Sequence, residues 1–172
     1  MSVLARLFRT RPDPRERLRP LWHRVVERSR DPQWYRDAGV ADTVSGRFDM
    51  IAAIMSLVLL RLEREPDSAS DQALLTELFV EDMDGQLRES GVGDMVVGKH
   101  MGRLVSALGG RLGSFRDALA DGNGPAWRDA LSRNVSLHDG ETPDELAKLL
   151  FAWRERLDAT DRAALLKGEL PQ

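Results

Sequence analysis

One stretch of sequence decides the fold: Met50-Ile51-Ala52-Ala53-Ile54-Met55-Ser56-Leu57-Val58-Leu59-Leu60. It is the longest apolar run in the chain, and only Ser56 interrupts it. As a helix this run is about 16 Å long, whereas the hydrocarbon core of a bilayer is about 30 Å thick, so the run is too short to span a membrane. A helix that is apolar on most sides normally lies buried at the centre of a bundle. We therefore expect residues 46–63 to form a central helix.

The rest of the chain shows helical periodicity and almost no strand pattern. Pro20 either kinks the first helix or marks its true start, and a long connection follows over residues 32–45. The apolar stripe of a fourth helix stays in phase across Gly109-Gly110, so we expect one helix up to about residue 120, kinked or loosened at the glycines. Helices are predicted over residues 13–30, 46–63, 71–90 and 94–120. Three further helices are predicted to begin at residue 125, at residue 144 and near residue 160.

The strongest local signal is Thr142-Pro143-Asp144-Glu145, which matches a capping box with proline at the first helical position. No repeat and no internal linker is visible. We predict an all-α fold, an irregular single-domain bundle of about six to seven helices with a long fourth helix. Residues 1–12 are expected to be a basic arm, and residues 13–172 a single helical domain.

The charge is unevenly distributed. The net charge is −3, yet residues 1–30 hold nine arginines against only three acidic residues. A basic segment on an acidic body either binds an anionic surface, such as lipid headgroups, RNA or an acidic partner, or is a solvated terminus. At an anionic membrane surface each arginine contributes about 1 kcal/mol. The candidates are Arg6, Arg9, Arg11, Arg15 and Arg17.

Residue types that carry chemistry occur in incomplete patterns. The chain has no cysteine, which excludes thiolate metal sites and a cysteine nucleophile. Residues 93–99 match a phosphate-loop pattern, but His100 stands where the chemistry needs Ser or Thr. A carboxylate run on the third helix could recruit magnesium, as in all-α metal-dependent phosphohydrolases, but one helix supplies too few ligands. We expect no catalytic residue, no cofactor and no metal, and keep a phosphohydrolase as the less favoured alternative.

Two stretches resemble the ubiquinol–cytochrome c chaperone family. The first is residues 39–49, Gly-Val-Ala-Asp-Thr-Val-Ser-Gly-Arg-Phe-Asp, which leads into the apolar helix. The second joins Phe79-Val80-Glu81-Asp82-Met83-Asp84, Leu87-Arg88-Glu89 and residues 91–99, and closes with Gly110-Arg111. The resemblance covers roughly residues 20–135. The chain departs from the family at Gly109, where an aromatic residue is usual, and at Ala41, where proline is frequent.

This resemblance implies a helical, non-catalytic protein that assists assembly of the cytochrome bc1 complex. Relatives in mitochondria act on newly made cytochrome b near the ribosome exit, together with a small partner subunit. For this chain it implies a cytoplasmic protein, peripheral at the inner face of the plasma membrane. The expected partners are cytochrome b or another bc1 subunit, the ribosome exit region or an anionic membrane surface, and a small partner subunit, but not DNA. The alternative is a generic helical protein-interaction adaptor.

Two sets of residues are candidates for the site. The family-like polar positions form either a network that fixes the bundle or a recognition face for the client: Arg47, Asp49, Asp82, Asp84, Arg88, Asp94, Lys99 and Arg111. The apolar positions form either a surface for the client or plain core: Met50, Ile54, Leu57 and Leu60. Gly98 and Gly102 are expected to let another helix of the bundle approach closely.

Overall fold

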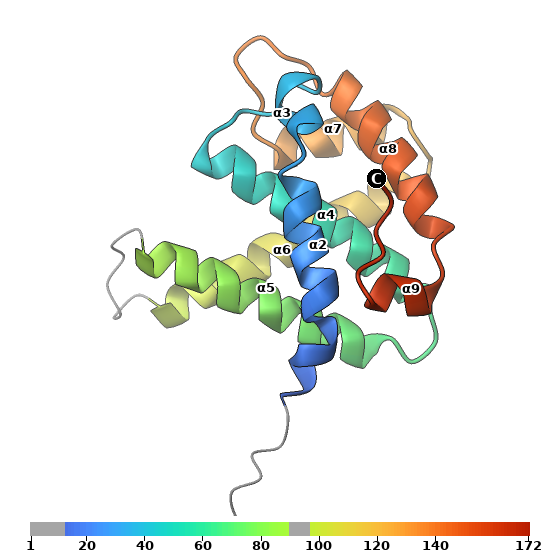
Figure 1. Cartoon of the computed structure of the whole chain (residues 1–172). Helices are drawn as coiled ribbons and strands as arrows, with labels where there is room; N and C mark the ends of the chain where they lie inside the picture. The colour runs from blue at the N-terminus through green and yellow to red at the C-terminus, as the bar shows by residue number, and fades with distance from the viewer. Residues whose placement is uncertain (1–12, 90–96) are drawn as a thin grey trace, which may run out of the picture.

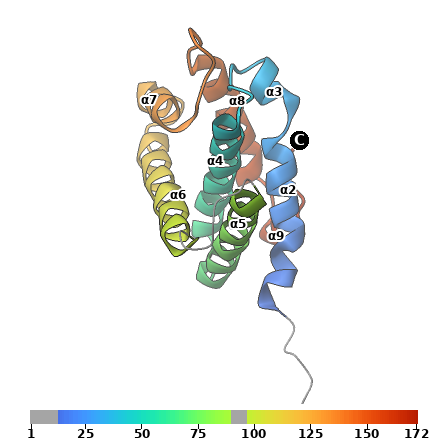
Figure 2. The ribbon, with the colours of Figure 1, turned by 90° about the vertical axis from the view of Figure 1, so that its left-hand side faces the viewer.

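Helix α4 (Val44–Glu63) lies at the centre of the bundle in a computed structural model that describes residues 13–89 and 97–172, and the side chains of these residues except those of 87–89 and 97–101. It packs against four other helices, as Figures 1 and 2 show: α2 (Arg19–Ser29), α5 (Ala69–Glu89), α6 (Val97–Leu119) and α8 (Asp144–Asp158). The remaining elements are η1 (Pro14–Leu18), α3 (Pro32–Arg36), α7 (Pro125–Asn134) and α9 (Arg162–Leu166). The described part of the chain holds no named strand, only an isolated bridge between Val40 and Leu137. The predicted all-α bundle is confirmed.

The apolar run lies in the core. Met50 and Ile54 are 0% exposed and Leu57 is 1% exposed, while Leu60 is half-buried against the same core. Burying such side chains contributes roughly 1.5–3 kcal/mol each. This corrects the idea that these four residues form an exposed client surface, because α4 is surrounded by other helices.

Large aromatic side chains attach α3, α7 and α8 to this core. Trp34, Trp127 and Trp153 are fully buried. The ring of Phe115 meets that of Trp127 edge-on, with centroids 4.8 Å apart, and the Trp127 indole donates a hydrogen bond to the Ala147 carbonyl at 3.0 Å. A buried indole N–H needs such an acceptor, so this contact fixes α7 against α8.

Most helix ends follow the sequence signals, with two corrections. Asp13 caps η1 as expected, and Pro20 lies in the first turn of α2, where a missing N–H costs nothing. The predicted connection over 32–45 contains a short helix, α3, which Asp31 caps. The capping box at α8 is wrong, because Pro143 and not Thr142 is the N-cap residue and no side chain caps this helix; the Thr142 hydroxyl donates to the Asp144 carboxylate at 2.7 Å.

Helix α6 continues without a break across Gly109-Gly110, as the phase of its apolar stripe predicted. The expected close helix contact at Gly102 is wrong, since a Cβ placed there would meet nothing within 4 Å. The contact expected at Gly98 falls in the part of α6 whose surroundings the structure does not describe. Within the described chain no helix combines the length and the apolar character that crossing a membrane requires.

Candidate functional site

A groove of about 1240 Å³ opens between α3, the start of α4, the end of α5 and α6. Its apolar surface comes from side chains of all four segments. It is lined by Arg30, Pro32, Tyr35, Arg36, Asp42, Val44, Ser45, Arg47, Phe48, Ile51, Met83, Gln86 and Leu104. We call this the α3–α6 groove. Its volume exceeds that of a typical small-molecule pocket, which is about 300–1,000 Å³, so it can accept part of a polypeptide.

Helix α3 forms one wall, and hydrogen bonds to the end of α2 hold it. The buried Trp34 indole donates to the Arg28 carbonyl at 2.7 Å, and the Tyr35 hydroxyl donates to the Ser29 carbonyl at 2.8 Å. Burial also raises the pKa of Tyr35. The Arg28 guanidinium stacks over Trp34, 4.9 Å from the ring centroid, and pairs with Asp31 at 2.7 Å. The wall is therefore rigidly placed before any ligand arrives.

The start of α4 forms the floor and depends on Gly46. A Cβ at this glycine would lie 1.9 Å from the Ala41 carbonyl oxygen, so no other residue fits without moving the backbone. Thr43 caps the helix by accepting a hydrogen bond from the Gly46 N–H at 3.1 Å. This close approach presents Val44, which is 88% exposed, at the rim of the groove.

The rim of the groove is basic. Arg47 pairs with Asp42 at 2.7 Å, and both side chains are exposed. That hydrogen bond lowers the pKa of Asp42 and raises the pKa of Arg47. Arg30 and Arg36 are also exposed, and the guanidinium group of neither forms a hydrogen bond or ion pair with another described residue. Two cationic groups thus remain available at the α3 side of the rim.

Two of the predicted polar positions meet in a buried network outside the groove. The Arg111 side chain is 7% exposed and donates to Asp49 at 2.8 Å and to the Asn134 carbonyl. The second Asp49 oxygen accepts hydrogen bonds from the Ser136 N–H at 3.0 Å and from the Ser136 hydroxyl at 2.7 Å. Burial lowers the pKa of Arg111. The network joins α4, α6 and the chain that follows α7.

The other polar positions do not join this network. Arg47 lies at the groove rim, and Asp82 and Asp84 are half-buried on α5. Asp94 lies outside the described residues, and the side chains of Arg88 and Lys99 lie outside the described side chains. The eight positions are therefore not one contiguous site within the described chain.

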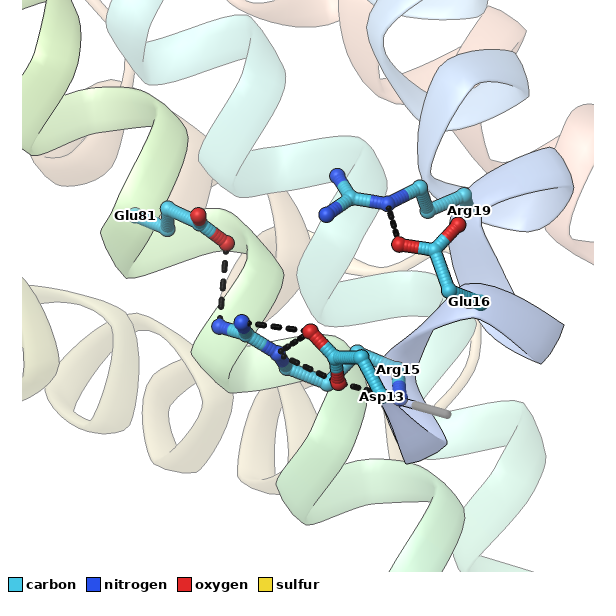
Figure 3. A network of polar contacts seen from close by, with 5 residues as sticks. All are labelled: Asp13, Arg15, Glu16, Arg19 and Glu81. Carbon is cyan, nitrogen blue, oxygen red and sulfur yellow. Dashed lines mark hydrogen bonds and ion pairs between the residues drawn. The ribbon is translucent and has the colours of Figure 1, made fainter. Parts of the chain in front are cut away.

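Two of the five predicted basic-arm residues anchor the fold instead. Arg15 pairs with Asp13 at 2.7 Å and with Glu81 of α5 at 3.0 Å (Figure 3). Hydrogen bonding to Asp13 raises the pKa of Arg15, and the same bonds lower the pKa of Asp13 to about 2. Arg17 pairs with the buried Asp71. This corrects the assignment of these two arginines to an anionic-surface site. Arg6, Arg9 and Arg11 lie outside the described residues.

One carboxylate of the run considered for magnesium, Glu81, is engaged in an ion pair. Glu81 binds Arg15, and among the described residues no group of three or more His, Cys, Asp or Glu side chains is arranged to hold a metal ion. Residues 93–96 of the phosphate-loop pattern lie outside the described residues.

The sequence alone did not predict the groove, the buried carboxylate Asp71, or the role of Ser136 as a partner of Asp49. Asp71 is 3% exposed and binds Arg17 of η1 and Arg162 of α9, the latter at 2.8 Å. The only feature of the sequence that could have marked Asp71 is its position in the first turn of α5. Ser136 had no signal, because its partner Asp49 is 87 residues away.

Comparison with known proteins agrees with this architecture. A crystal structure of the Cbp3 homolog from Brucella abortus superimposes with a TM-score of 0.79 and 28% sequence identity, over 97% of this chain and 94% of that one. No curated protein matches the chain. A sequence model described as ubiquinol-cytochrome C chaperone matches residues 36–171, which is most of the chain. The chain therefore belongs to the ubiquinol–cytochrome c chaperone family.

Proposed function

We propose that this protein holds newly made cytochrome b before that subunit joins the cytochrome bc1 complex, and that the α3–α6 groove contacts it. Family membership supports the bc1 complex as the destination. The observation that carries the proposal is the groove itself, whose apolar floor is open at a rim that includes the exposed Val44. A newly made membrane subunit exposes apolar segments to water, and shielding such a segment removes its drive to aggregate.

The groove suits a transient holder better than a catalyst. Its lining is fixed by the contacts of Trp34, Tyr35 and Gly46, and the described residues that line it include no His, Cys or Glu. We infer that the protein works by binding alone. The protein is also proposed to act at the inner face of the plasma membrane, where its client is inserted. A small partner subunit and the ribosome exit region are further proposed contacts.

Site-specific crosslinking tests the proposal. A photoreactive residue at Val44 should crosslink to newly synthesised cytochrome b in the source organism, whereas one at Ser132, exposed on α7, should not. Deleting the gene should remove assembled bc1 complex and leave the cytochrome b transcript intact. Normal bc1 levels in the deletion strain would reject the function, and capture of soluble partners without respiratory subunits would favour an adaptor.

A further inference from the structure

The two walls of the α3–α6 groove differ in chemistry. On the α3 side stand Arg30 and Arg36, both exposed and without a carboxylate partner among the described residues. On the α5 and α6 side stand Met83 and Leu104, both buried apolar side chains. A ligand that satisfies both walls must be amphipathic and can be seated in only one orientation.

The start of α4 adds to the positive potential at the same rim. Its first turn contains no acidic residue, so no carboxylate within that turn offsets the positive end of the helix dipole. Among the described residues that line the groove, Asp42 is the one carboxylate, and it is already paired with Arg47. The rim therefore attracts negative charge, although the whole chain has a net charge of −3.

From this asymmetry we propose that the occupant of the groove is an amphipathic polypeptide segment with an apolar face and acidic side chains along one edge. Its apolar face packs on Phe48, Met83 and Leu104, and its carboxylates pair with Arg30 and Arg36. The inference rests on the proposed function and adds the chemistry that selects the segment. Guanidinium groups suit this task because they bind carboxylates in a bidentate manner. Since the pairs are exposed, they set orientation and choice of partner more than total affinity.

Peptide binding to the full chain tests this proposal. The probe is a fluorescein-labelled helical peptide with leucine on one face and glutamate along one edge, and its twin carries glutamine in place of glutamate. Fluorescence anisotropy should show the glutamate peptide binding about three- to tenfold more tightly at low salt, with the difference shrinking as salt rises.

Variants at exposed positions keep the fold intact and locate the effect. R30Q combined with R36Q should remove the preference for glutamate, whereas R133Q, an exposed control on α7, should leave it unchanged. Val44→Glu should weaken binding of the glutamate peptide, and Val44→Lys should strengthen it.

Equal binding of the two peptides, no binding of either, or an equal effect of R133Q would overturn the proposal. The crosslink from Val44 to cytochrome b does not depend on peptide charge. If that crosslink forms while the peptides bind equally, the proposed function stands and only the charge selection is wrong.

Discussion

Asp49 on α4 accepts a hydrogen bond of 2.8 Å from Arg111 on α6, across 62 positions of sequence. Both side chains are largely buried, with exposed fractions of 16% and 7%. Removing one partner of such a pair leaves an uncompensated charge inside the protein, which costs more than the pair itself contributes. The relationship makes Asp49 a structural residue.

Asp49→Ala should therefore lower the free energy of unfolding by about 3 kcal/mol. The matched control is Asp42→Ala, which removes the exposed partner of Arg47 and should cost less than about 1 kcal/mol. Urea denaturation followed by circular dichroism measures both. Equal losses in the two variants would show that the Asp49 network does not stabilise the bundle.

The second prediction concerns pH and the buried Asp71. Burial alone would raise the pKa of this carboxyl, but hydrogen bonds from Arg162 and Arg17 outweigh burial and lower the pKa below its ordinary value of 3.8. A lowered carboxyl pKa contributes stability that is present above the ordinary value and is lost as the pH falls through the lowered one. The contacts between η1, α5 and α9 should thus weaken in acid.

Asp71→Asn should lower the stability measured at neutral pH, and its unfolding free energy should then fall less steeply than that of the wild type below pH 3.8. Urea midpoints over a pH series give the slopes. Asp139→Asn, at an exposed loop position, should keep the wild-type slope. A wild-type slope in Asp71→Asn would contradict the role assigned to the Arg17–Asp71–Arg162 contacts.

The third prediction compares two glycines in helices. Gly46→Ala places a methyl group 1.9 Å from the Ala41 carbonyl oxygen, so the chain before α4 must shift, at a cost of roughly 1–3 kcal/mol. Gly110→Ala meets nothing within 4 Å and should stabilise the protein by about 0.5–1 kcal/mol, since alanine is the better helix former. Thermal unfolding should therefore shift in opposite directions. Stabilisation by Gly46→Ala would mean that the close approach does not exist.

Patterns that lie within one segment allowed most helices to be predicted. The apolar run of α4 and the in-phase stripe of α6 each extend over several turns. The local pattern is therefore strong enough to predict these two helices without knowledge of their tertiary contacts. The short helix α3 was missed because it has only five residues and begins directly after the end of α2. At α8 the capping box failed because the helix begins at Asp144, so Pro143 and not Thr142 stands at the N-cap position.

The groove could not be predicted from patterns within single segments. Its walls come from residues 30–36, 42–51, 83–86 and 104, which only the packing of four helices brings together. Each side chain taken alone reads as ordinary core or ordinary surface. The same limit explains Arg15 and Arg17, whose acidic partners Glu81 and Asp71 are 66 and 54 residues away.

The last prediction separates the two kinds of arginine near the N-terminus. Arg6, Arg9 and Arg11 precede the first described residue, whereas the guanidinium groups of Arg15 and Arg17 are already bound to carboxylates. We propose that the first three bind an anionic membrane surface at about 1 kcal/mol each. Replacing all three with glutamine should then weaken binding to vesicles that contain phosphatidylserine by up to about 100-fold.

Replacing Arg15 and Arg17 with glutamine is the matched control. It should change vesicle binding little and should instead lower the stability of the protein, because Asp71 and Glu81 lose partners. Co-sedimentation with vesicles and urea denaturation measure the two effects. If the control weakens vesicle binding as much as the triple replacement does, the membrane contact includes η1, and the ion pairs to α5 must open when the protein binds lipid.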